Sequence, residues 1–332
     1  DFCKINKIKS LGLSDTYNLS GALEFSENLS TVGTQPIIGT QILFKYKNFT
    51  GFMSLIAKNK DGYKNIIELS SKSYLENSEI ADPHCNFVDL LNKSSGIIVL
   101  SGSIRGLIGS LFNKGLFNEI NDIIEKLSKT FKNDFYLEIQ RHGDLNEKEF
   151  ENHNLSISRK FDLPIIATNE VYYLDQNMHE AHDALMCIGQ KTYVNDTNRL
   201  RLSNQHYFKS SDEMFELFND LPEALENNFS LPYRCTFRPL PSKPILPNIS
   251  SSDIDANDLL KKDSYEGLND KFNKIFKIEK LDLDKNENYQ HYKKRLDHEI
   301  KIILEMNYAG YFLIVSDYIK WAKNNSIPVG PG

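Results

Sequence analysis

Residues 134–143 read Asp-Phe-Tyr-Leu-Glu-Ile-Gln-Arg-His-Gly, an apolar run from Phe135 to Ile139 that Arg141 and His142 follow almost at once. A short apolar run with polar borders predicts a buried β-strand. Four more runs share this pattern, at residues 11–13, 36–38, 96–100 and 164–167. Segments with helical periodicity lie between the runs, at residues 19–29, 63–75 and 116–131. The alternation predicts an α/β fold, with βα units around a parallel sheet or barrel.

Polar residues follow each predicted strand. In chain order they are Asp15, Gln41, Ser101 and Ser103, Arg141 and His142, and Asn169 and Glu170. In a βα barrel the carboxyl ends of the strands form one rim, where a metal or phosphate site gathers charges and donors. The same residue types also cap helices, as Asn18 or Ser20 would before Leu23, and from the residues alone capping is the simpler explanation.

The composition indicates a folded chain with a sizeable core. The 332 residues are 40% hydrophobic and 25% charged, which excludes disorder, collagen and coiled coil. The length predicts one or two domains. A net charge of -6 argues against a surface that binds nucleic acid everywhere, and leaves room for a local basic groove.

The cysteines and the lack of membrane and signal segments indicate the cellular location of the protein. Cys3, Cys85, Cys187 and Cys235 lie far apart without a CxxC pair, which predicts a reducing, cytoplasmic location. No apolar run is long enough to span a membrane, and no signal peptide is visible.

Because the first residue is not Met and residues 330–332 read as an opening loop, we expect a piece of a longer chain.

The composition of the sequence changes after Cys235. Residues 238–244 are rich in proline and residues 250–253 are rich in serine, which is typical of a linker. Long helical segments follow at residues 257–276, 289–306 and 310–325. One apolar stripe of the middle segment comprises Leu296, Ile300, Ile303 and Leu304. The predicted organisation is a first domain at 1–236, a linker at 237–256 and a second domain at 257–332.

Several familiar motifs are weak or missing. His179 and His182 are three residues apart, whereas a zinc-binding helix needs two histidines four apart, so we expect a structural pair. The chain has no phosphate-binding P-loop and no Gly-x-Ser-x-Gly elbow, and residues 102–106 lack the glycine spacing of a dinucleotide site.

A basic and aromatic region near the carboxyl end permits two interpretations. Its members are Lys293, Lys294, Arg295, Lys320 and Lys323, with Tyr308, Tyr311, Phe312 and Trp321. Such residues can contact a nucleic-acid backbone and stack on bases. A solvated helix face over a packed aromatic core is the simpler interpretation.

Several stretches of the sequence together resemble a known family. Residues 308–315, 319–323 and 327–332 are similar to the start of the palm in bacterial DNA polymerase III alpha subunits. Residues 62–65, 137–143, 167–170 and 221–227 are similar to the PHP (polymerase and histidinol phosphatase) domain of that family. The resemblance covers essentially the whole chain. It implies a PHP-type distorted βα barrel without its first strand, then a linker and the helical start of a polymerase palm.

The resemblance implies a function for the intact protein. That function is template-directed DNA synthesis in chromosomal replication, a nucleotidyl transfer that uses a DNA primer-template, deoxynucleoside triphosphates and Mg²⁺. Gly330, Pro331 and Gly332 would begin the loop that holds the nucleotide phosphates. The catalytic aspartates of the family follow later, so the 332 residues alone are not expected to polymerise DNA.

The resemblance also implies that the PHP metal site has lost most of its ligands. Asp15, His142 and Glu170 keep ligand chemistry, with Glu170 in place of an aspartate. The replaced ligands are Thr16 for a histidine, Gln41 for a glutamate, Phe52 for a histidine, Ser103 for a cysteine and Tyr172 for a histidine. Phenylalanine cannot bind a metal, and amides, hydroxyls and phenols are poor substitutes for the lost donors. We expect a vestigial pocket that binds no metal.

The implied partners are a separate proofreading exonuclease docked on the PHP domain, the sliding clamp and other replisome subunits, with no membrane. The overall similarity favours the main replicative polymerase over its error-prone paralogue. Two alternatives are a free-standing PHP phosphoesterase, which would need an intact ligand set, and a non-catalytic replisome scaffold.

Overall fold

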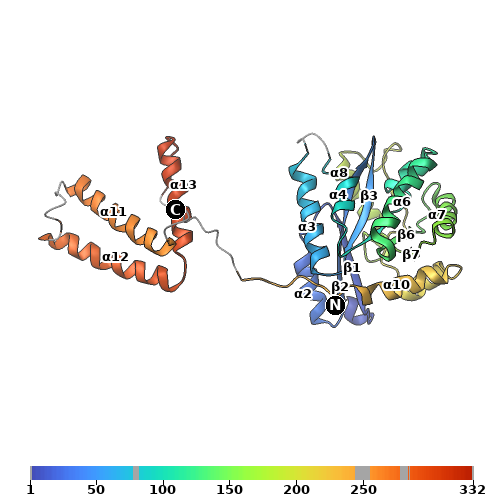
Figure 1. Cartoon of the computed structure of the whole chain (residues 1–332), viewed down its shortest axis with the longest axis horizontal. Coiled ribbons are helices and arrows are strands. Elements are labelled where there is room, and N and C mark those ends of the chain that lie inside the picture. Colours follow the sequence, from blue (N-terminus) through green and yellow to red (C-terminus); the bar gives the residue numbers. More distant parts are fainter. Residues whose placement is uncertain (1, 78–81, 244–254, 277–282, 284, 331–332) are drawn as a thin grey trace. The chain divides into compact units, whose positions relative to one another are not determined.

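The computed structural model describes residues 2–77, 82–243, 255–276, 283 and 285–330. The chain divides into two compact units, Asp1–Pro241 and Ser242–Gly332 (Figure 1). The serine-rich part of the predicted linker and the last two residues of the predicted phosphate loop lie outside the described residues.

The first unit contains one sheet with helices around it. Its strands are β1 (Ser10–Thr16), β2 (Gln35–Tyr46), β3 (Phe49–Ala57), β4 (Cys85–Asn86), β5 (Ile97–Leu100), β6 (Phe135–Ile139) and β7 (Ile165–Ala167). The strand order is β1-β2-β3-β5-β6-β7, and β4 pairs with β2. Its α-helices are α1 (Phe2–Ile5), α2 (Ala22–Thr31), α3 (Lys60–Leu75), α4 (Phe87–Asn92), α5 (Leu107–Asn113), α6 (Phe117–Phe131), α7 (Glu147–Phe161), α8 (His179–Gln190), α9 (Ser211–Leu217) and α10 (Pro222–Arg234).

The α/β class is confirmed, and the sheet that was expected to be parallel is mixed. The pairs β1–β2, β5–β6 and β6–β7 are parallel, whereas β3 is antiparallel to both β2 and β5. The reason is the very short connection after Tyr46, where Lys47 has a left-handed φ of 53°. A connection this short can only return the chain as an antiparallel hairpin, because parallel strands need a long crossover.

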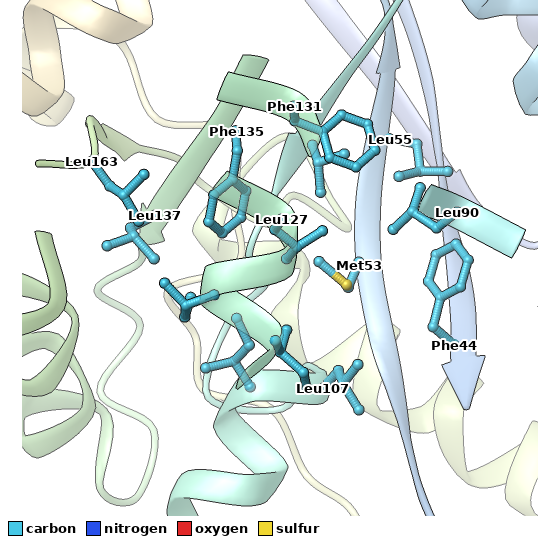
Figure 2. Close-up of a cluster of buried hydrophobic side chains, with 14 of the residues drawn as sticks. Phe44, Met53, Leu55, Leu90, Leu107, Leu127, Phe131, Phe135, Leu137 and Leu163 are labelled. Atoms are coloured by element: carbon cyan, nitrogen blue, oxygen red, sulfur yellow. The ribbon is translucent and has the colours of Figure 1, made fainter. Parts of the chain in front are cut away.

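The two faces of the sheet bury two separate clusters of side chains. Alternate residues point to opposite faces of a strand. In β5, Ile97 and Val99 therefore join the larger cluster, and Ile98 and Leu100 join the smaller one. Helices α3 to α7 contribute to the larger cluster, and Figure 2 shows part of it. The smaller cluster contains Leu231 and Cys235 from the region of α10, so the chain covers both faces.

The start of the predicted linker belongs to the first unit. The ring of Phe237 lies 5.1 Å from that of Tyr63, centroid to centroid. A buried hydroxyl, Ser26 Oγ, donates to the carbonyl of Pro239 at 2.9 Å. These contacts fix the chain against α2 and α3 before the second unit begins.

The second unit has three described α-helices, α11 (Ala256–Phe276), α12 (Glu287–Glu305) and α13 (Ala309–Asn324), which confirms the predicted helical segments. Leu260, Ala309 and Leu313 form a small core, and Ile303 and Leu304 of the predicted stripe pack against it.

Candidate functional site

The loop after β5 carries the central side chain of the candidate site. Gly102 has φ +86°, and a Cβ atom on it would lie 3.0 Å from the carbonyl oxygen of Phe52 in β3. A Cβ atom on Gly106 would lie 2.9 Å from the same oxygen. Both positions therefore favour glycine, and the loop turns tightly against β3. The turn presents Arg105 beside the carboxyl ends of β6 and β7.

Arg105 binds acidic side chains from two neighbouring loops. Its Nη2 lies 2.6 Å from Glu170 Oε2, and its Nε lies 3.3 Å from Asp144 Oδ2. Glu170 follows β7, and its other carboxylate oxygen accepts a hydrogen bond from the Tyr172 hydroxyl at 2.8 Å. Burial, followed by the charge of Glu170, raises the pKa of Tyr172, so the phenol stays protonated and donates.

Two buried histidines stack beside this guanidinium. The rings of His142 and His206 lie 4.1 Å apart and nearly parallel. His206 Nε2 lies 3.5 Å from Arg105 Nη2, and His206 Nδ1 lies 3.0 Å from the carbonyl oxygen of Glu170. Burial, together with His142, lowers the pKa of His206 to about 3. The imidazole of His206 is therefore neutral at physiological pH.

A buried carboxyl group accepts hydrogen bonds from the loops after β5, β6 and β7. Glu138 of β6 accepts hydrogen bonds from the Gly102 amide at 3.1 Å, from Gln140 Nε2 at 2.9 Å and from the Thr168 hydroxyl. Burial raises the pKa of Glu138. Because these donors follow β5, β6 and β7, the side chain fixes the floor of the candidate site.

The predicted site residues fall into two groups. Ser103, His142, Glu170 and Tyr172 lie in or beside the Arg105 cluster, where Ser103 Oγ accepts a hydrogen bond from the Arg105 amide at 3.2 Å. These four positions therefore share one region, and their contacts include Arg105, His206 and His182.

The other predicted residues lie on β1 to β3, with Asp15 and Thr16 at the end of β1, Gln41 within β2, and Phe52 within β3, where it forms a β-bridge with Gly106. Thr16 pairs in register with Gln41, and both Asp15 and Thr16 are exposed. Phe52 packs edge-on against Tyr17, with 5.2 Å between ring centroids. Within the described residues, no hydrogen bond or ion pair joins Asp15, Thr16 or Gln41 to the Arg105 cluster.

This donor set does not fit a metal ion. In the described part of the chain, no group of three or more His, Cys, Asp or Glu side chains is placed to hold one. Glu170 and Asp144 already neutralise a guanidinium, and a divalent ion beside that cation would be repelled. Phe52 and Tyr172 supply no carboxylate, thiolate or imidazole.

Sequence reasoning missed Arg105, Asp144 and His206. Arg105 lies in the segment 102–106, whose two glycines signal a tight loop after a strand. Asp144 lies two residues beyond His142, in the loop after β6. His206 follows no strand of the sheet and comes into the site through backbone hydrogen bonds between residues 172–173 and 206–208. No periodicity in the sequence indicates that pairing.

The other motifs have structural contacts. His179 Nε2 lies 3.0 Å from the carbonyl oxygen of Leu202, and His182 stacks on Tyr172 at 5.2 Å. Asn18 does not cap α2, contrary to one expectation. Instead its Oδ1 accepts from the Ser20 amide at 3.0 Å, and the helix begins after Gly21 without a side-chain cap.

The carboxyl-terminal basic and aromatic residues lie on α12 and α13 and in the turn between them. The aromatic side chains are not a packed core, because Tyr311 is 50% exposed and Trp321 is 61% exposed. Two of the cations form exposed ion pairs, Arg295 with Glu299 and Lys320 with Asp263. None of the helices in the described ranges is long and apolar enough to cross a membrane.

Comparison with known families defines the class of both units. Residues 1–142 match the PHP domain, and residues 258–332 match the bacterial DNA polymerase III alpha NTPase domain. The first unit is thus a PHP domain, a curled sheet with helices around it. A crystal structure from Bifidobacterium adolescentis, provisionally described as a metal-dependent phosphoesterase, is 12% identical with a TM-score of 0.36 over 51% of this chain and 79% of that chain.

Curated relatives extend the match over both units. The DNA polymerase III alpha subunits of Rickettsia bellii and Caulobacter vibrioides are each 38% identical, and that of Haemophilus influenzae is 34% identical, over 98–99% of this chain. The chain belongs to the family of bacterial DNA polymerase III alpha subunits. It spans about 28% of the length of these relatives.

Proposed function

We propose that the full-length protein is a template-directed DNA polymerase of chromosomal replication that acts in the cytoplasm. Its substrates are a DNA primer-template and deoxynucleoside triphosphates, and Mg²⁺ supports nucleotidyl transfer. The observation that carries the proposal is identity of 33–39% to polymerase III alpha subunits across both units. We assign no polymerase catalytic role to the 332 residues, and Gly330, Pro331 and Gly332 begin the phosphate-binding loop.

The PHP domain of this protein is a non-hydrolytic scaffold in this proposal. The arrangement of Arg105 supports it, because Glu170, which the resemblance places at a metal-ligand position, instead binds a guanidinium. A hydrolase of phosphate esters needs bound ions to activate water and stabilise the leaving oxygen. The same observation speaks against the alternative of a free-standing PHP phosphoesterase.

One assay tests both statements. The full-length protein is incubated with Mg²⁺ and a primer whose 3′ end is either matched or mismatched, with Zn²⁺ or Mn²⁺ added in parallel reactions. We expect extension of the matched primer and no excision of the mismatched nucleotide under any metal condition. Template-dependent extension that fails with Mg²⁺ refutes the polymerase, and excision that Glu170→Gln abolishes refutes the non-hydrolytic PHP domain.

A non-hydrolytic PHP domain leaves proofreading to another protein, so we propose that a separate exonuclease subunit docks on it. The sliding clamp and other replisome subunits are further partners of the full-length protein. Size-exclusion chromatography of the full-length protein with the exonuclease subunit of the same organism tests the docking. Co-elution that persists when the PHP domain is deleted contradicts it.

A further inference from the structure

Helix α10 presents two neighbouring aromatic rings to solvent. Phe229 and Tyr233 lie one helical turn apart and are 73% and 75% exposed. Their ring centroids are 5.8 Å apart, with 57° between the ring planes. The helix itself lies at the outside of the first unit (Figure 1). Two adjacent rings that folding leaves in water indicate a surface that binds a ligand or a partner.

The opposite face of α10 holds the helix on the sheet. Ala224 and Leu231 are buried, and Leu231 belongs to the smaller core cluster. Asn227 Nδ2 also donates a hydrogen bond to the carbonyl oxygen of Ile165 in β7 at 2.8 Å. Because packing and this hydrogen bond fix the inner face, the two aromatic rings stay on the outer face.

Cations adjoin the carboxyl end of the helix. The Arg234 guanidinium donates a hydrogen bond to the carbonyl oxygen of Asn133 at 2.8 Å, so the turn between α6 and β6 lies beside the end of α10. Asp134 in that turn forms ion pairs with both Arg234 and Lys58. Lys132 is exposed and forms no ion pair with any residue that the structure describes. Three cations thus share one carboxylate, which leaves a net positive charge.

Exposed aromatic rings beside cations are the combination that binds single-stranded nucleic acid, because bases stack on the rings and cations bind the phosphates. We propose that the α10 surface, formed by Phe229, Tyr233, Lys132 and Arg234, binds single-stranded DNA. The inference rests on the proposed function, in which the template strand ahead of the primer end supplies single-stranded DNA.

The residues around the rings favour DNA over a protein partner. Asn228 and Ser230 on the same helix are exposed and polar, so the surface lacks the continuous apolar centre of a stable protein interface. Glu226 lies three residues before Phe229 on the same side of the helix, where its carboxylate repels a phosphate. We therefore expect the strand to cross the rings on the side toward Lys132.

The experiment uses the full-length protein and an oligothymidylate in which 5-iodouracil replaces some of the bases. Ultraviolet light cross-links such a base to an aromatic side chain in contact with it, and tandem mass spectrometry identifies the residue. We expect cross-links at Phe229 and Tyr233, with a yield that falls as the salt concentration rises. Phe215 of α9 is the matched control, because it is 64% exposed but lies among Asp212 and Glu216, and it stays unmodified.

Charge variants test whether the cations bind the strand. We expect Lys132→Ala to lower the cross-link yield at Tyr233 by about 2–5-fold, and Glu226→Gln to raise it by about 2-fold. Lys129→Ala is the matched control, because it removes an exposed cation that is already paired with Glu125, and it leaves the yield unchanged.

The outcomes separate the inference from the proposed function. No cross-link on α10 overturns the inference, and so does a yield that Lys132→Ala and Glu226→Gln both leave unchanged. Primer extension by the same preparation is measured in parallel. If extension succeeds and α10 is unmodified, only the inference falls, whereas failed extension refutes the polymerase.

The same surface can also be tested for a protein partner. If the double variant Phe229→Ala/Tyr233→Ala loses co-elution with the exonuclease subunit and the wild-type α10 forms no cross-link, the α10 surface binds protein and the inference is wrong. Co-elution that persists in the double variant, together with cross-links at both rings, supports DNA as the occupant.

Discussion

Arg141 shows how single residues hold the PHP domain together. Its guanidinium binds Glu151 through two hydrogen bonds of 2.8 Å and also reaches Asp220 in the turn before α10. The guanidinium carbon lies 4.9 Å from the ring centroid of Phe218, which is fully buried. The side chain of Glu151 is only 3% exposed, so its charge depends on this partner.

We therefore expect Arg141→Ala to lower the free energy of unfolding by about 2–4 kcal/mol, because it strands a buried carboxylate. Lys148→Ala is the matched control. Lys148 contacts the same carboxylate at 2.8 Å but is 67% exposed, so its loss costs only about 0.2–0.5 kcal/mol. Urea unfolding measures both variants, and equal losses would contradict the role given to Arg141.

His153 makes stability depend on pH. Its ring lies 5.2 Å from that of Phe112 and 5.3 Å from that of Phe117, and burial lowers its pKa. The unfolded chain takes up a proton near the ordinary pKa of about 6.5, whereas the folded ring resists protonation. Stability is therefore lost as pH falls below about 6.5.

His153→Phe keeps an aromatic ring at this position and removes the titration. We expect its free energy of unfolding to fall less steeply between pH 7 and pH 5 than that of the wild type, by up to about one bound proton. Urea unfolding at several pH values gives the slope. Identical slopes would show that His153 does not contribute.

At the residue scale, the sequence predicts which side chains lie close together but not which contacts they form. Glu170, Tyr172 and Ser103 follow strands or lie near their ends, so their proximity to His142 was predictable from strand order. The pairing of Glu170 with Arg105 was not, because it depends on how the loop at residues 102–106 turns. His206 enters through a long irregular segment, for which sequence periodicity carries no information.

At the element scale, helix α3 and the turn before β5 approach each other very closely. A Cβ atom on Gly62 would lie 1.8 Å from the carbonyl oxygen of Gly96. The side chain of Asn59 caps the helix by accepting from the Gly62 amide at 3.0 Å. Backbone, rather than a flexible side chain, thus blocks any larger residue at position 62.

We expect Gly62→Ala to lower the free energy of unfolding by about 2–4 kcal/mol, because α3 must shift away from β5. Gly189→Ala in α8 is the control, since nothing lies within 4 Å of its added Cβ. That change is neutral or stabilising by up to about 1 kcal/mol. Thermal unfolding compares the two, and a neutral Gly62→Ala would refute the close approach.

Helices with a strong apolar periodicity were predictable from the sequence, whereas strands that depend on pairing with a neighbouring strand were not. The segments at 116–131 and 310–325 match α6 and α13 to within one residue at each end, because an apolar stripe identifies a helix directly. Strand β3 was missed, although Phe49 to Ala57 is mostly apolar, since its identity depends on a hairpin with β2. The two-residue strand β4 is too short to carry any pattern.

At the scale of the whole molecule, the first unit contains everything that its core needs. Both clusters on the two faces of its sheet are built from residues before Pro241. We expect a chain of residues 1–241 to fold on its own and to unfold in one cooperative transition. Circular dichroism and thermal unfolding test this, and an aggregated or non-cooperative product would contradict it.

The most direct test of the central claim is the metal content of the full-length protein, purified without chelators or added metals. Inductively coupled plasma mass spectrometry is applied to the wild type and to Glu170→Gln. The account predicts that neither protein carries a stoichiometric amount of Zn, Mn or Fe, because Arg105 supplies the charge in the PHP pocket. One or more equivalents in the wild type that disappear in Glu170→Gln would contradict it.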